Sequence, residues 1–137
     1  MELHVFVATR DMPVRDRWQE RLDLSGFGTV LDEAFAPDVD RGFVPVTFGG
    51  TTTGFEFSLG EASSITDAYP QAVARIGDRG SCATFTWSGS LDELAAAVTA
   101  AASLAAIGDG IYFDPQDDAF LVGADALMHA HEVLESP

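Results

Sequence analysis

The stretch that decides the fold is SCATFTWSGSLDELAAAVTAAASLAAIGDGIYFD, residues 81–114. Residues 81–88 alternate apolar and polar side chains, which is typical of a half-buried strand. Apolar residues then recur at helical spacing over 91–107, and Gly108 is a residue that ends helices. The apolar run 110–114 predicts a further strand. The stretch therefore predicts a strand–helix–strand unit, and a parallel pairing of its two strands would be right-handed.

The start of the central helix is marked by Ser90 and Glu93. A serine hydroxyl before a helix accepts a hydrogen bond from a first-turn amide, and a glutamate three residues later reaches back to the amide of the serine. This spacing predicts a capping box at Ser90.

The residues on either side of this unit add elements of the same two kinds. Before the unit, the patterns predict a strand over 3–8, a helix after Pro13 with the stripe Val14, Trp18 and Leu22 and a stop at Gly26, and a short strand over 29–31. They also predict a hairpin of 44–48 and 55–59 with a several-residue loop from Gly49, and a short helix over 67–76. After the unit, they predict a strand over 120–122 and a last helix around 127–134.

Together these elements predict one α+β domain over residues 1–137. We expect two layers, a mixed and mainly antiparallel sheet with helices packed chiefly on one face. A ferredoxin-like arrangement is one form that this element order can take.

The charge of the chain is strongly negative. Its 137 residues include seven arginines, no lysine and 22 Asp and Glu residues, so the formal net charge is 7 − 22 = −15. Such a surface repels phosphate backbones and anionic lipids, so we expect no nucleic-acid partner and no membrane partner. The missing lysine excludes Schiff-base chemistry and a phosphate-loop lysine. A basic protein is the partner that this charge favours.

The cysteine count bears on the compartment. Cys82 is the single cysteine, so no internal disulfide forms and a reducing cytoplasm fits. The apolar start Met1–Val7 is short and has no basic leader, so we interpret it as a strand and not a signal peptide. We expect a cytoplasmic protein.

An acidic turn is the first candidate site. Asp109, Asp114, Asp117 and Asp118 supply the oxygen ligands that Ca²⁺ and Mg²⁺ prefer, but their spacing does not match a calcium loop. Ordinary turn chemistry explains the same residues. We therefore predict no metal and no cofactor, and retain the four aspartates as binding candidates.

The outer face of the sheet is the second candidate. Glu56 lies between Phe55 and Phe57, so it must point away from an aromatic core. By alternation it shares a face with Thr47, Ser58, Thr84, Thr86 and Cys82. That face is either the solvated side of an antiparallel sheet or a surface for a ligand or partner. No base accompanies Cys82 in the sequence, so we predict no catalytic residue.

Short motifs are spaced over most of the chain: Phe6-Val7, Trp18-Gln19, Gly42-Phe43-Val44-Pro45, Gly54-Phe55-Glu56-Phe57, Thr84-Phe85-Thr86-Trp87, Glu93-Leu94-Ala95-Ala96 and Tyr112-Phe113-Asp114-Pro115-Gln116. In these motifs the chain resembles a group of small uncharacterised bacterial α+β proteins. The ending, a strand followed by Asp-Pro-Gln and a helix, also resembles segments of immunity-type proteins that neutralise bacterial toxins. The resemblance implies a shared fold more than a shared activity, and it carries over no catalytic residue.

Three functions follow from these observations. The first is a non-enzymatic, acidic protein-binding module, such as an immunity-like inhibitor of a basic toxin. The second is a small ligand-binding domain or enzyme that uses the outer sheet face around Glu56. The third is an oligomerising module that buries this face against another copy, and the sequence leaves the oligomeric state open.

Overall fold

The structure is a computed structural model and describes residues 1–135. Its sheet has seven strands in the order β2-β3-β4-β5-β1-β6-β7, and every neighbouring pair is antiparallel. The strands are β1 (Glu2–Val7), β2 (Thr29–Leu31), β3 (Gly42–Phe48), β4 (Thr51–Glu61), β5 (Ser81–Thr86), β6 (Ile111–Asp114) and β7 (Ala119–Val122). The predicted α+β class is confirmed.

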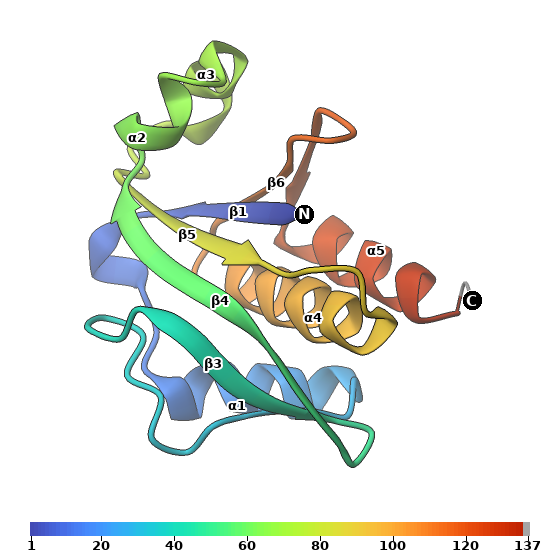
Figure 1. Ribbon diagram of the computed structural model, residues 1–137. Coiled ribbons are helices and arrows are strands. Elements are labelled where there is room, and N and C mark those ends of the chain that lie inside the picture. The colour runs from blue at the N-terminus through green and yellow to red at the C-terminus, as the bar shows by residue number, and fades with distance from the viewer. Residues whose placement is uncertain (136–137) are drawn as a thin grey trace.

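Three longer helices cover one face of this sheet: α1 (Arg15–Ser25), α4 (Leu91–Ile107) and α5 (Gly123–Glu135). Figure 1 shows them below the sheet, with α4 between the other two. Helix α4 is buried without interruption from Ala95 to Ala105. Because alanine has a small side chain, the sheet and both neighbouring helices can approach it closely. The expected helical layer on one face is therefore present, with α4 at its centre.

The strand–helix–strand unit forms as β5, α4 and β6, but its two strands do not pair. Strand β1 lies between them, with Val5 opposite both Ala83 and Tyr112. The predicted unit is therefore present without a parallel pairing, and the sheet is antiparallel throughout and not mixed. The reason is burial: β1 is buried from Leu3 to Val7, and a strand with two buried faces belongs in the sheet interior.

The central order β4-β5-β1-β6 has the connectivity of a split βαβ arrangement. Strands β2, β3 and β7 extend the sheet beyond it, so a ferredoxin-like description of the whole domain stays a prediction.

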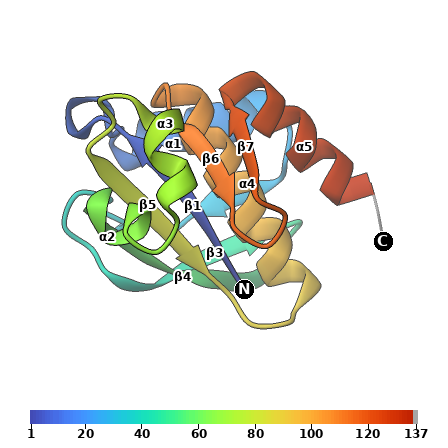
Figure 2. The ribbon, with the colours of Figure 1, turned by 90° about the horizontal axis from the view of Figure 1, so that it is seen from above.

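The opposite face of the sheet, which we call the outer face, is covered only in part. Short helical turns between β4 and β5 lie on it: α2 (Ser63–Thr66), η2 (Pro70–Ala72) and α3 (Val73–Ile76). Figure 2 shows these turns in front of β5 and β1, while β3 and the start of β4 extend past them. They bury a second apolar cluster that includes Phe6, Cys82 and Phe113. The outer face is therefore closed over β1 and β6 and open beside β3 and β4.

Local signals set several element ends differently from expectation. The hairpin of β3 and β4 has a two-residue turn, Gly49-Gly50, and not a longer loop. Both glycines have positive φ (56° and 83°), a conformation that suits the tight turns of hairpins. Val14 precedes α1 and is exposed, so it lies outside the buried stripe. The helix predicted over 67–76 begins only at Pro70, where the 3-10 turn η2 leads directly into α3, and a separate short helix, α2, ends before it at Thr66.

The capping box is half formed. The Ser90 hydroxyl accepts a hydrogen bond from the Glu93 amide at 3.4 Å, as predicted. The Glu93 carboxylate, however, accepts a hydrogen bond from the Ser88 hydroxyl at 2.6 Å. The short turn before α4 is thereby held to the first turn of the helix.

Candidate functional site

The acidic turn does not form one cluster. Strand β6 separates Asp109 at one end from Asp114, Asp117 and Asp118 at the other. Asp109 and Asp118 both have a φ of 50°, a left-handed turn conformation that aspartate tolerates. The Asp114 carboxylate accepts the Gln116 amide at 2.9 Å, which is a local Asx turn.

Side chains elsewhere hold two of these aspartates. The Gln71 amide group donates to Asp118 at 3.0 Å, and Arg79 lies 3.7 Å from the Asp109 carboxylate. Within residues 1–135, no group of three or more His, Cys, Asp or Glu side chains is placed to hold a metal ion. Turn chemistry and pairing therefore account for Asp109, Asp114 and Asp118.

The outer-face residues do come together. Glu56 lies opposite Thr86 and Ser58 opposite Thr84, across β4 and β5. On the other side of β5, strand β1 places Glu2 opposite Thr86. The predicted shared face is therefore confirmed for these four residues, and β1 contributes a second carboxylate.

His4 belongs to the same face but is buried. Its Nδ1 lies 2.9 Å from the Thr84 hydroxyl and its Nε2 lies 3.3 Å from Glu2. Burial lowers the pKa of His4 below its usual value, and the nearby Glu2 carboxylate offsets part of this effect. The imidazole lies next to Tyr69 and Phe113, with ring centres 6.3 and 6.1 Å away. His4 therefore holds β1 to β5 rather than facing a ligand.

Cys82 also lies on the covered part of the outer face. The residue is 2% exposed, and burial raises the pKa of its thiol to about 12. Because the thiolate is the nucleophilic form, this thiol is inert near neutral pH.

A groove lies at the edge of the sheet, between the first part of β4 and the start of α4. Strand β4 is longer than β5, and it pairs with β5 only from Glu56 onward. Beside the unpaired part lie two hollows of about 320 and 430 Å³, and Phe43, Ser88 and Glu93 line both. We call their combined lining the β4 groove: Phe43, Thr52, Thr53, Gly54, Phe55, Glu56, Thr86, Trp87, Ser88, Ser90, Asp92 and Glu93.

An exposed aromatic side chain forms one wall of the β4 groove. Phe43 is 57% exposed although it lies in a strand. Its ring lies over Gly54 of the neighbouring strand, where a Cβ atom would collide with the ring and with the Val44 carbonyl oxygen. Gly54 therefore allows the Phe43 ring to lie close against β4. Phe43 was not predicted as a site residue from the sequence, although the alternation of Phe43 with Val44 indicated that its side chain points outward.

The charges in the β4 groove have one sign. Glu56, Asp92 and Glu93 line it, and no arginine does. Trp87 also lines it and is 8% exposed, and its indole N–H has no hydrogen-bond partner within residues 1–135. That N–H is itself buried, so the groove offers a partner its carboxylates and one exposed aromatic ring.

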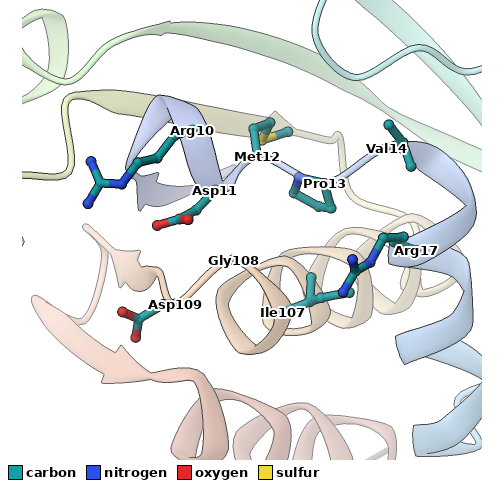
Figure 3. Close-up of a pocket in the computed structure, with 9 residues that line it drawn as sticks. All are labelled: Arg10, Asp11, Met12, Pro13, Val14, Arg17, Ile107, Gly108 and Asp109. Atoms are coloured by element: carbon teal, nitrogen blue, oxygen red, sulfur yellow. The ribbon is translucent and has the colours of Figure 1, made fainter.

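Another hollow, of about 490 Å³, lies where the start of α1 meets the end of α4 (Figure 3). Its lining includes Arg10, Asp11, Arg17 and Asp109, with an apolar wall from Met12, Pro13, Val14 and Ile107. We call it the arginine hollow. This hollow was not predicted from the sequence, although four of the seven arginines fall within residues 1–21.

The arginine hollow is electrostatically mixed. Arg10 lies 3.2 Å from Asp78, and this arginine lowers the pKa of Asp78. Arg79 donates to the Asp109 backbone carbonyl at 2.7 Å. Charges of both signs, beside the positive end of the α1 dipole and the negative end of the α4 dipole, favour neither an anion nor a cation strongly. The β4 groove is the better-defined candidate site.

Comparison of the chain with protein families, curated proteins and solved structures finds no match. The resemblance to immunity-type proteins therefore stays a prediction. No helix within residues 1–135 is long and apolar enough to cross a membrane.

Proposed function

We propose that this protein is a non-enzymatic binding module that holds a basic protein in its β4 groove, in the manner of an immunity-like inhibitor of a basic toxin. The observation that carries the proposal is the groove itself, which three acidic residues line together with the exposed ring of Phe43.

The charge of the chain supports this proposal at long range. A net charge of −15 attracts a basic protein before contact and raises the association rate. Carboxylates at the contact then orient the partner and reject acidic competitors.

The ring of Phe43 supports it at short range. Aromatic side chains are enriched among the few residues that dominate binding energies at protein interfaces. Phe43 is held in place by β4 below it, so little side-chain freedom is lost when a partner covers the ring.

The alternative of an enzyme around Glu56 has less support. Glu56 is exposed, and neither a histidine nor a cysteine lines the groove with it. General acid–base work needs a second positioned group, so the arrangement suits contact better than catalysis.

The experiment that tests the proposal is affinity capture from the source lysate at about 50 mM and about 500 mM salt, where Debye lengths are about 14 and 4 Å. The captured protein is then purified and titrated into wild type, Glu56→Gln, Phe43→Ala and the control Glu61→Gln. Glu61 ends the same strand and lies outside the β4 groove.

We expect one basic protein that binds in a 1:1 complex and is lost at high salt. Phe43→Ala should raise its Kd at least about tenfold and Glu56→Gln about threefold to tenfold, while Glu61→Gln changes it less than about twofold. If no protein is retained at low salt, if the partner is a second copy of this chain, or if the groove variants bind like the control, the proposal is wrong.

A further inference from the structure

The β4 groove has an unused hydrogen-bonding strand edge along one side. We infer that the partner enters the groove as an extended basic segment that adds a strand to β4 along Thr51–Phe55. This inference rests on the proposed function and specifies how the partner binds.

The register of the hairpin determines which backbone groups face the groove. The Pro45 carbonyl accepts the Asp32 amide at 3.1 Å, so Pro45 directs its backbone toward β2 and away from β4. Backbone groups alternate in direction along a strand. Val44 and Val46 therefore bond to their partners on β4, which are Phe55 and Thr53.

The same alternation applies to β4. Because Thr53 and Phe55 bond toward β3, Thr52 and Gly54 direct their N–H and C=O groups to the opposite side. Strand β5 begins its pairing with β4 at Glu56 and so does not reach them. Such an edge is a template on which an extended segment forms backbone hydrogen bonds.

The chain leaves room beside this edge. After Thr86, residues 87–90 leave the sheet and lead into α4 instead of continuing along β4. The two hollows of the β4 groove occupy the place where β5 would have continued. An added strand would therefore lie between β4 and the start of α4.

The side chains around this place indicate a basic segment. Successive side chains of a strand point to opposite faces, so an added strand meets Glu56 and Phe43 on the outer face and Asp92 and Glu93 at the start of α4. Lysine or arginine at alternate positions would pair with these carboxylates and lay an aliphatic stem or guanidinium on Phe43.

The test uses an eight-residue peptide with blocked ends that alternates lysine and valine, and a control peptide that alternates glutamate and valine. Amide hydrogen exchange of the wild-type protein is measured by NMR with and without each peptide. We expect the lysine peptide alone to bind and to slow exchange at Thr52 and Gly54 at least about tenfold, because their amides become hydrogen-bonded. Thr53, already bonded to β3, should change little.

A pair of variants tests the same bond from the protein side. Thr52→Pro removes the amide that faces the groove, and Thr52→Val keeps it with a similar side-chain shape. We expect the proline variant to weaken lysine-peptide binding at least about fivefold and the valine variant to stay within about twofold of wild type. The exchange measurement on wild type needs neither variant to fold.

Unchanged exchange at Thr52 and Gly54 with the peptide bound would overturn strand addition. So would the absence of binding at millimolar peptide, or equal binding by both peptides. The proposed function fails separately, since it depends on whether Glu56→Gln and Phe43→Ala release the partner captured from the lysate.

Discussion

The buried imidazole of His4 links pH to the stability of the sheet. It bridges two strands through Thr84 and Glu2, and burial lowers its pKa below the unfolded value of about 6.5. As pH falls through 6.5, the unfolded chain takes up a proton that the folded chain resists. The contribution of His4 to stability is therefore fully present above the unfolded pKa and is lost as pH falls toward the folded pKa.

The substitution His4→Gln should alter how the free energy of unfolding depends on pH. Between about pH 7.5 and pH 5, the free energy of unfolding of wild type should fall relative to that of the variant, because only wild type has the imidazole to protonate. Urea denaturation at several pH values measures the difference. The same substitution at exposed His131 is the control. Parallel pH profiles for wild type and His4→Gln would contradict the argument.

Single residues also show how far alternation predicts a site. The neighbours Phe55 and Phe57 were enough to place Glu56 on the outer face, and the register with Thr86 confirms it. The acidic turn was different, because grouping its aspartates by nearness in sequence ignored the strand predicted over 110–114, which as β6 keeps Asp109 apart from the other three. Phe43 carried the same alternation signal as Glu56, but its exposure depends on where the covering turns end.

The alanines of helix α4 allow the sheet and the two neighbouring helices to pack closely around it. Eleven consecutive residues from Ala95 to Ala105 are buried between the sheet, α1 and α5. The Trp18 indole N–H donates to the Ala100 carbonyl at 3.0 Å, so α1 packs directly against the α4 backbone. A larger side chain at a buried alanine of this stretch would press on one of these neighbours.

We therefore predict that Ala101→Leu lowers the free energy of unfolding by about 1–3 kcal/mol, through overpacking. Ala74→Leu makes the same change on exposed α3 and should stay within about 0.5 kcal/mol of wild type. Chemical denaturation of both variants checks this. Equal stability of wild type and Ala101→Leu would show that α4 is packed less tightly than the structure indicates.

Individual strands and helices were easier to predict than the pairing of the strands within the sheet. Periodicity, Gly26 and Gly108 indicated the strands and the long helices, because these signals are local. The position of β1 between β5 and β6 depends on pairings such as Glu2 with Thr86, which join the beginning of the chain to a strand in its second half. Local patterns contain no record of such pairings, so the strand order had to come from the structure.

Over the whole molecule, charge distinguishes two surfaces. The β4 groove has carboxylates and no arginine, whereas the arginine hollow has both signs and lies where α1 and α4 meet. A basic partner is attracted by the net charge toward any acidic part of the surface, so salt dependence alone does not locate its contact. The central claim, that contact occurs at the β4 groove, needs a measurement with residue resolution.

The most direct measurement is an NMR titration of the isotope-labelled protein with the purified basic partner. We predict that amide shift changes concentrate at Thr52–Glu56 and Ser88–Glu93, the two walls of the β4 groove. Changes confined to Arg10–Arg17 and Ile107–Asp109, with the groove unaffected, would place the contact at the arginine hollow and contradict the account.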